Sequence, residues 1–353
     1  MNILKKEAIQ LLQQLIAIES FSKTEDKTAS LIENFFSQKN ILTNRLLNNI
    51  WVKNKFFNVN KPTILLNSHH DTVKPNSQYT KNPFEPIVED SKLFGLGSND
   101  AGGSLVALIA CFLNFYDKHD LNFNIILAAT AEEEISGKNG VELVLPQLGN
   151  IYFGIVGEPT QMDIAIAEKG LLVIDCIANG KTGHAAREEG ENAIYKALKD
   201  IEWFQSFQFP KVSKVLGPIK MSVTMIQAGL QHNIVPETCK FTVDIRTTDE
   251  YTNQEVVNII QQHVSSTIQS RSIRLNPSTV SVTHPLVIAG QSLHCKLYGS
   301  PTTSDQALMS FPTFKMGPGD SARSHSADEF IFINEIEEGI EMYIKLLNAF
   351  NLS

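Results

Sequence analysis

The stretch Thr63-Ile64-Leu65-Leu66-Asn67-Ser68-His69-His70-Asp71 decides the fold, because an apolar run passes directly into two imidazoles and a carboxylate. A short apolar run of this kind is typical of a strand buried in a parallel sheet, and such sheets bind ligands beyond the carboxyl ends of their strands. Two further runs, 124–130 and 152–156, also lead into acidic residues, and helical stretches separate the three runs. We therefore predict an α/β fold with a mostly parallel sheet.

Charged side chains at these strand ends predict a metal site. Several carboxylates and imidazoles in one crevice are costly to desolvate unless their charge is neutralised, which a divalent cation does. Nitrogen and oxygen ligands without sulfur suit zinc, cobalt or manganese. The sequence therefore predicts a metal-assisted hydrolase, whose candidate residues in chain order are His69, Asp71, Asp100, Glu133, Glu134, Glu158 and His325.

The spacing of these residues gives some of them distinct tasks. Asp71, two residues after His69, can orient the imidazole from behind. Two cations about 3.5–4 Å apart need a shared carboxylate, and Asp100, just before a glycine-rich helix start, is suitably placed. Glu133 and Glu134 are adjacent, so one can bind a cation while the other takes a proton from water.

Each signal has a simpler interpretation when it is taken alone. Acidic residues such as Glu132-Glu133-Glu134 often begin a solvated helix. The segment 95–100 resembles half of a dinucleotide-binding loop, but Asp100 stands where the third glycine belongs. Gly317-Pro318-Gly319 alone is a turn. The metal interpretation is favoured because all the ligand types occur together and in order.

Composition and charge restrict the classes of partner. The 353 residues carry a net charge of −8 with a pI near 5.6, which argues against nucleic acid or an anionic membrane surface as a partner. We expect no signal peptide and no membrane span. The four cysteines, Cys111, Cys176, Cys239 and Cys295, are widely scattered, so neither a disulfide scaffold nor a sulfur-ligated zinc site is indicated. A cytoplasmic protein is expected.

A second domain is predicted within the chain, because 353 residues exceed the usual size of one core. From Gly170 the pattern becomes β-α-β-β-α-β, which is the ferredoxin-like arrangement. Its segments are a strand at 172–178, a helix at 192–204, strands at 220–226 and 240–246, a helix at 253–268 and a strand near 273–282. We therefore predict a discontinuous catalytic domain of residues 1–168 and 281–353, interrupted by an inserted α+β domain of residues 169–280.

Helices flank the deciding stretch on both sides. Apolar residues at helical spacing predict amphipathic helices around 9–16 and 29–36, and Ser22-Lys23-Thr24-Glu25 resembles a capping box for the second. Gly102-Gly103 opens a third helix, where small residues suit a crowded site. A helix at 335–347 returns the chain to the first domain.

Five motifs run in order from one end of the predicted catalytic domain to the other. They are Ser68-His69-His70-Asp71, Gly97-Ser98-Asn99-Asp100-Ala101-Gly102-Gly103, Glu132-Glu133-Glu134-Ile135-Ser136-Gly137, Gly157-Glu158-Pro159-Thr160, and Gly317-Pro318-Gly319 through His325. These motifs resemble those of the M20 metallopeptidases, and within them the branch of acetylornithine deacetylase and succinyl-diaminopimelate desuccinylase.

The resemblance implies a role for each motif residue. It implies two divalent cations, with Zn²⁺ expected and Co²⁺ as the alternative. One would be held by His69, Asp100 and Glu158, and the other by Asp100, Glu134 and His325. Glu133 would be the general base and Asp71 the partner of His69. A cis peptide bond between Asp100 and Ala101 is also implied.

The inserted domain carries further matches, which imply a lid and dimerisation domain and hence a homodimer. Segment 180–186 resembles the family's lid motif, in which His184 would reach the partner subunit's active site and stabilise the oxyanion. Asn233 and Arg246 match positions that bind substrate in relatives. Segment 300–305, with Thr303 and Ser304, resembles the loop that binds the substrate carboxylate.

Taken together, these features imply a di-metal amidohydrolase that removes the acyl group of a small Nα-acyl amino acid. N-acetylornithine, in arginine biosynthesis, is the expected substrate, with succinylornithine or acetylcitrulline as close analogues. The alternatives are succinyl-diaminopimelate desuccinylase and a small dipeptidase. Lys169-Gly170 disfavours the former, because some desuccinylases carry paired arginines there. A non-catalytic amino-acid-binding relative is the remote alternative, which the presence of Glu133 disfavours.

Overall fold

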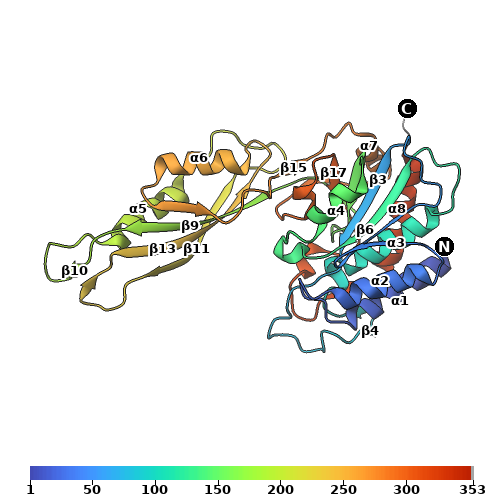
Figure 1. The fold of residues 1–353 in the computed structure, drawn as a ribbon, viewed down its shortest axis with the longest axis horizontal. Coiled ribbons are helices and arrows are strands. Elements are labelled where there is room, and N and C mark those ends of the chain that lie inside the picture. The colour runs from blue at the N-terminus through green and yellow to red at the C-terminus, as the bar shows by residue number, and fades with distance from the viewer. Residues whose placement is uncertain (351–353) are drawn as a thin grey trace. The chain divides into compact units, whose positions relative to one another are not determined.

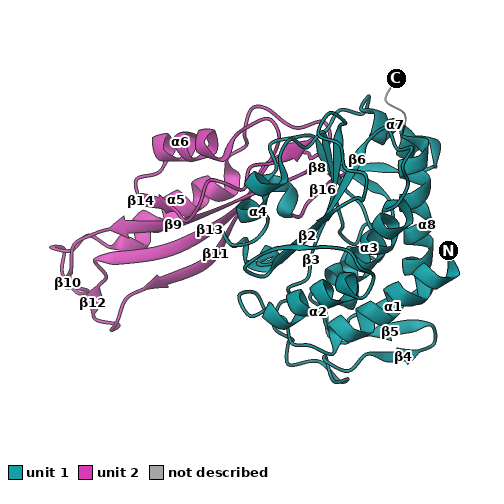
Figure 2. Cartoon of the chain, turned by 45° about the vertical axis from the view of Figure 1, so that its right-hand side comes forward, with its two compact units in different colours: residues 1–166, 280–298, 304–353 teal, residues 167–279, 299–303 magenta. Residues whose placement is uncertain are grey.

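The computed structural model describes residues 1–350, which belong to two compact units (Figures 1 and 2). Unit 1 comprises Met1–Ile166, Val280–Tyr298 and the chain from Ser304 onward. Unit 2 comprises Ala167–Thr279 and the short segment Gly299–Thr303. Unit 1 contains the motifs at the strand ends, and unit 2 contains the segment with the ferredoxin-like pattern.

The central sheet of unit 1 confirms the predicted α/β fold. Its strand order is β1-β2-β6-β3-β7-β17-β8. The three predicted strands are β3 (Thr63–His69), β6 (Asn124–Thr130) and β7 (Phe153–Val156), and β3 lies between the other two with parallel pairing on both sides. Their carboxyl ends therefore meet at one edge. The other strands of this sheet are β1 (Asn44–Leu46), β2 (Asn49–Lys53), β8 (Ile164–Glu168), β16 (Leu297–Ser300), which pairs with β8, and β17 (Thr313–Lys315).

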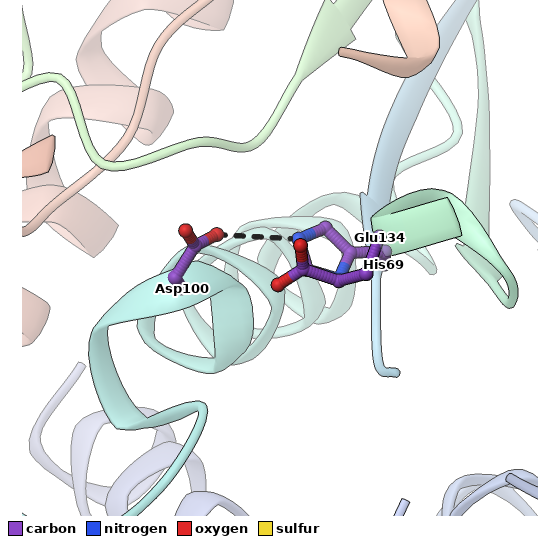
Figure 3. Close-up of side chains that lie close together, drawn as sticks. All are labelled: His69, Asp100 and Glu134. Atoms are coloured by element: carbon purple, nitrogen blue, oxygen red, sulfur yellow. Dashed lines mark hydrogen bonds and ion pairs between the residues drawn. The ribbon is translucent and has the colours of Figure 1, made fainter. Parts of the chain in front are cut away.

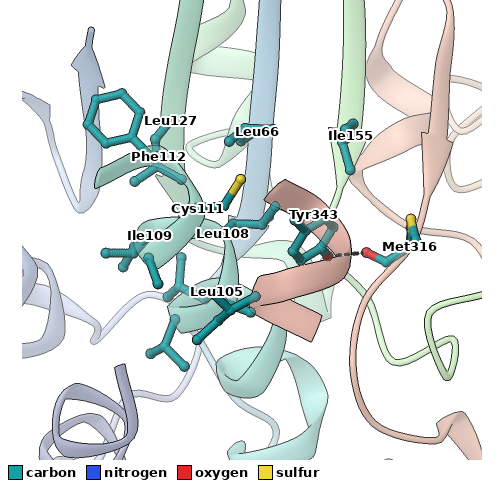
Figure 4. Packing of buried hydrophobic residues seen from close by; sticks show 14 of the residues in the cluster. Leu66, Leu105, Leu108, Ile109, Cys111, Phe112, Leu127, Ile155, Met316 and Tyr343 are labelled. Atoms are coloured by element: carbon teal, nitrogen blue, oxygen red, sulfur yellow. Dashed lines mark hydrogen bonds between the residues drawn. The ribbon is translucent and has the colours of Figure 1, made fainter. Parts of the chain in front are cut away.

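Helices pack on both faces of this sheet, which explains why β3, β6 and β7 are buried at every position. Ile64 and Leu66 of β3 belong to the larger core cluster, whereas Leu65 belongs to a separate cluster with Val141 and Val144. Figure 4 shows the larger cluster, in which helix residues pack beside Leu66 and Leu127. The helices of unit 1 are α1 (Asn2–Ile16), α2 (Asp26–Ser37), α3 (Gly103–Phe115), α4 (Val141–Leu148), α7 (Pro285–Ser292) and α8 (Ile333–Ala349).

The start of α3 is closely packed. A Cβ atom on Gly102 would lie 2.4 Å from the carbonyl oxygen of Gly97, so glycine is required for this close approach. The preceding turn η1 (Ser98–Gly102) is irregular at Asp100, and the Asp100–Ala101 peptide bond is cis, as the resemblance implied. Shorter elements complete unit 1: turns η2 (Glu133–Ile135), η3 (Asp305–Leu308) and η4 (Ser321–Arg323), and a small sheet of β4 (Ile87–Glu89), β5 (Lys92–Phe94) and β18 (Phe330–Phe332).

Unit 2 has the predicted ferredoxin-like order. Its sheet runs β11-β13-β9-β14, all antiparallel. The elements are β9 (Gly170–Asn179), α5 (Ala193–Ser206), β11 (Lys220–Ala228), β13 (Thr238–Thr247), α6 (Asn253–His263) and β14 (Thr267–Ser270), with a small ladder of β10 (Gly183–His184) and β12 (Ile234–Val235), and β15 (Ser278–Thr279) opposite the end of β8.

The predicted end of α6 and the predicted last strand were wrong. The helix ends at His263 rather than at 268, and the last strand of the sheet is β14, before the predicted 273–282. Buried Asp200 accounts for this difference, because its carboxylate accepts hydrogen bonds from the amides of Ser265 and Ser266 and so turns the chain out of the helix. Within residues 1–350, no helix has both the length and the apolar character needed to cross a membrane.

Candidate active site

The seven candidate residues of unit 1 come together at the carboxyl edge of the central sheet. His69 is the last residue of β3, and Asp71 follows it. Glu133 and Glu134 lie in turn η2 after β6, and Glu158 follows β7. Asp100 is in turn η1, and His325 is in the loop between η4 and β18.

The carboxylate of Asp100 lies between two imidazoles. Its Oδ1 atom is 3.4 Å from Nε2 of His69, and its Oδ2 atom is 3.8 Å from Nε2 of His325. Glu134 lies on the same side as His325, with Oε2 3.0 Å from that Nε2. Figure 3 shows Asp100, His69 and Glu134 pointing toward one another from different elements, and their ligand atoms all lie within 4.8 Å of one another.

This spacing is that of ligands around a shared cation. Two ligand atoms about 2.1 Å from one zinc ion, at a tetrahedral angle, would lie about 3.4 Å apart. The distances from Nε2 of His69 to Asp100, Glu133 and Glu158 are 3.4, 4.0 and 4.0 Å. The same imidazole therefore faces three carboxylates at distances that fit a cation between them.

The charge of the cluster also fits a cation. Burial raises the pKa of Glu158 to about 8, and the neighbouring Asp100 carboxylate adds to this shift. Burial likewise raises the pKa of Glu133 and of Glu134. These acids are hard to ionise together in a buried place, so a bound divalent cation would stabilise their charged forms. The donor set and its electrostatics are thus those of a metal site.

The ring of His69 is held in one orientation. Its Nδ1–H donates to the backbone carbonyl of Asp71 over 2.9 Å, while the Asp71 carboxylate is more distant at 3.5 Å. In the neutral ring the hydrogen is then on Nδ1, and Nε2, which faces Asp100, can bind a metal. The Asp71 carboxylate also accepts hydrogen bonds from the backbone amides of Glu133 and Glu134. It thus holds the turn that carries both glutamates.

Glu133 and Glu134 have different surroundings despite being adjacent. Both oxygens of the Glu134 carboxylate lie within 3.2 Å of His325 Nε2. No hydrogen bond to the Glu133 carboxylate occurs among residues 1–350, and its nearest charged partner is His69 at 4.0 Å. The side chain of Glu133 is only 13% exposed, so the pair is not a solvated helix start. This arrangement would allow Glu134 to bind a cation and leaves the Glu133 carboxylate free to take a proton.

His70 differs from its neighbour His69. Its Nδ1 lies 2.9 Å from the Thr28 hydroxyl, and its Nε2 lies 2.8 Å from the carbonyl oxygen of Asn48. Burial lowers its pKa to about 4, so the ring is neutral and donates through Nε2. Both ring nitrogens are used within the fold, which makes His70 a structural histidine.

Sequence reasoning missed a layer of residues behind the ligands. The predicted capping box at 22–25 was wrong: the Ser22 hydroxyl donates to Asp71 Oδ2 over 2.7 Å, and the buried Glu25 carboxylate accepts from the amide of Glu132. The buried carboxylate of Glu329 accepts from three amides of the turn that carries Asp100. For Glu329, the sequence offered one signal: it is an acidic residue four positions after the candidate ligand His325.

The predicted lid and substrate residues lie mostly in unit 2. Strands β10 and β12 pair His184 with Ile234, which brings His184 next to Asn233. His184 is exposed, and its Nδ1 accepts from the amide of Ala186 over 3.1 Å. Arg246 forms a two-pronged ion pair with Asp244.

The two residues of the predicted carboxylate loop fall on either side of the unit boundary. The Thr303 hydroxyl donates to the carbonyl of Lys169 within unit 2. Ser304, in unit 1, caps turn η3 with its hydroxyl, which accepts from the amide of Gln306. Both side chains therefore have hydrogen-bonding roles in the fold.

Curated relatives match almost the whole chain. The succinyl-diaminopimelate desuccinylase of Psychromonas ingrahamii is 26% identical, and the match covers 95% of this chain and 96% of that protein. The [LysW]-lysine/[LysW]-ornithine hydrolase of Saccharolobus islandicus is 25% identical, over 97% and 96% of the two chains. The acetylornithine deacetylase of Buchnera aphidicola is 25% identical, over 97% of each.

Solved structures share the fold. The M20 family metallo-carboxypeptidase Sso-CP2 of Sulfolobus solfataricus superposes with a TM-score of 0.78 at 17% identity, over 98% of this chain and 99% of that one. The YXEP protein of Bacillus subtilis, a dinuclear metal-binding peptidase of the M20 family, gives a TM-score of 0.74 at 16% identity, over 98% of each chain.

The family itself follows from the match to a family model. Residues 65–349 match the model of peptidase family M20/M25/M40, and this range contains every candidate metal ligand described above. The predicted resemblance is confirmed. The chain belongs to peptidase family M20/M25/M40 and is a hydrolase of amide bonds.

Proposed function

We propose that this protein hydrolyses the amide bond of a small Nα-acyl amino acid, and that N-acetylornithine, an intermediate of arginine biosynthesis, is its preferred substrate. The observation that carries the proposal is the Asp100 carboxylate between His69 and His325, with the unengaged Glu133 beside it. A shared carboxylate and a free base are what metal-assisted amide hydrolysis requires. A cytoplasmic location remains a prediction.

Two divalent cations, Zn²⁺ in the first instance and Co²⁺ as the alternative, would be held on either side of Asp100. His69 and Glu158 would complete one site, and Glu134 and His325 the other. This division follows the distances, because His69 lies nearer Oδ1 of Asp100 and His325 nearer Oδ2. When bound, the cations make a water molecule nucleophilic near neutral pH and polarise the substrate carbonyl.

Proton transfer falls to Glu133. Its carboxylate takes a proton from the attacking water as the carbon–oxygen bond forms, and gives it to the amine nitrogen as the carbon–nitrogen bond breaks. The products are a free carboxylic acid and the free amino group of the amino acid. Burial raises the pKa of Glu133, which suits a group that must both accept and return a proton.

Unit 2 would act as a lid and dimerisation domain, with His184 reaching the active site of a partner subunit. Because His184 Nδ1 accepts a hydrogen bond from Ala186, a neutral ring carries its hydrogen on Nε2, which is then free to donate to an oxyanion. Asn233 and Arg246 would contact the substrate, and Thr303 and Ser304 its carboxylate. The protein would then be a homodimer.

The choice among substrates rests on the relatives. Enzymes named acetylornithine deacetylase, succinyl-diaminopimelate desuccinylase and [LysW]-lysine/[LysW]-ornithine hydrolase match over almost the whole chain at 25–26% identity. Each of these names describes an enzyme that releases an amino group of an amino acid from an amide bond. Lys169-Gly170, where some desuccinylases carry paired arginines, places the diaminopimelate substrate second.

The substrate is tested with a panel of acetyl, succinyl and dipeptide derivatives of ornithine, citrulline, lysine and diaminopimelate. We expect the highest kcat/KM for N-acetylornithine, followed by acetylcitrulline and succinylornithine. A higher kcat/KM for succinyl-diaminopimelate or for dipeptides would assign the alternative function.

The base is tested by Glu133→Gln, which keeps the shape of the side chain and removes its ability to take a proton. We expect kcat to fall by about 10²–10⁴, while elemental analysis finds the metal content of the wild type. The control is Glu85→Gln, an exposed glutamate of the same unit, which should leave kcat unchanged. Turnover near that of the wild type in a fully metallated Glu133→Gln protein refutes the role.

The dimer is tested by complementation between two inactive proteins. His184→Ala should keep its metal and lose about 10²–10³ in kcat. When it is mixed with Glu133→Gln subunits and allowed to re-associate, about half of the dimers are mixed, and each has one intact site of two. We therefore expect recovery of about a quarter of wild-type activity. If mixed dimers form without any recovery, His184 does not act across the interface.

A further inference from the structure

Glu329 is a buried acid that the proposed reaction does not use. Its side chain is 2% exposed, and it is the fourth residue after His325. Its backbone is fixed by its neighbours, because the amide of Gly95 donates to the Glu329 carbonyl over 3.0 Å and Phe330 pairs with Phe94 between β18 and β5. The carboxylate is therefore presented from a rigid strand start.

The carboxylate of Glu329 accepts hydrogen bonds from three backbone amides of one short turn. Oε1 accepts from Asn99 over 2.8 Å and from Asp100 over 2.9 Å, and Oε2 accepts from Gly97 over 3.1 Å. The backbone of Asp100, and with it the direction of its side chain, is thus fixed by Glu329.

Asn99 forms a second link between the Asp100 turn and the segment that carries His325. Its side chain is fully buried, and it exchanges two hydrogen bonds of 3.0 Å with the amide and the carbonyl of Asp320, just before the loop that carries His325. The Asp100 turn and segment 320–329 are therefore joined at both ends of that segment. Asp100 and His325, each from one of these segments, cannot shift independently.

We propose that Glu329 is a positioning residue of the proposed metal centre. It fixes the orientation of the Asp100 carboxylate relative to His325. The proposed cation between Asp100, Glu134 and His325 would then bind to ligands that are already in place. The inference rests on the proposed two-cation site. It assigns Glu329 no contact with substrate or cation. Groups that orient metal ligands in this way are typically worth 10–100-fold in metal affinity.

The test is the Zn²⁺ affinity of the metal-free protein, measured by competition with a chelating dye. Glu329→Gln keeps the size of the side chain, but its NH₂ group must face one of the three amides. We expect Zn²⁺ binding to weaken by about 10–100-fold, and Glu329→Ala to weaken it at least as much. Activity of Glu329→Gln should return toward the wild-type kcat at high Zn²⁺, unlike that of Glu133→Gln.

The matched control is the adjacent acid. Asp328 also accepts hydrogen bonds from loop amides, those of Thr80 and Lys81 at 2.9 Å each, but none from the Asp100 turn. Its φ of 52° is one that asparagine tolerates, so Asp328→Asn should fold and bind Zn²⁺ as the wild type does. Equal losses in Asp328→Asn and Glu329→Gln would overturn the proposal, as would unchanged Zn²⁺ affinity in both Glu329 variants.

A measurement on the unaltered protein keeps the proposal testable if the variants do not fold. In the metal-free wild type, the amides of Gly97, Asn99 and Asp100 should exchange slowly with deuterium, because Glu329 holds them without a cation. Rapid exchange at these amides would reject the proposal. A wild type that binds fewer than two Zn²⁺ ions would instead reject the proposed two-cation site, so the two failures are distinguishable.

Discussion

The central constraint on this molecule is the convergence of four carboxylates and two imidazoles at one buried edge of a parallel sheet. The Asp100 carboxylate is placed between His69 and His325; Glu133 and Glu158 lie near His69, and Glu134 lies near His325. Burial and neighbouring carboxylates raise the pKa of each of the three glutamates, which makes their joint ionisation unfavourable. The proposed cations would offset the free-energy cost of ionising these carboxylates together. This explains physically why so many acids are placed at one point of the fold.

Loops carry most of these candidate ligands, and buried acids hydrogen-bond to the backbone of the loops. Asp71 accepts from the amides of Glu133 and Glu134, Glu25 accepts from that of Glu132, and Glu329 accepts from those of the Asp100 turn. Each of these carboxylates accepts at least one hydrogen bond from the backbone of a loop. A polar layer of this kind orients ligands that the strands alone could not hold.

The sequence predicted that His69, Asp100, Glu133, Glu134 and Glu158 would lie together, because each follows an apolar strand or precedes a glycine-rich turn. The parallel strands β3, β6 and β7 then bring those ends together without further information. The layer behind the ligands was not predictable in the same way, because Glu329 and Asn99 are 230 positions apart and their contact exists only after folding. The predicted end of α6 was wrong for a related reason. The Asp200 carboxylate accepts hydrogen bonds from the amides of Ser265 and Ser266, which lie 65 and 66 residues further along the chain.

The central claim is that Asp100 bridges two cations. Anomalous diffraction at the zinc absorption edge, from crystals of the metal-loaded protein, tests it most directly. The account predicts two peaks about 3.5–4 Å apart, with one oxygen of the Asp100 carboxylate directed at each. A single peak, or two peaks of which one lies out of reach of Asp100, would contradict it.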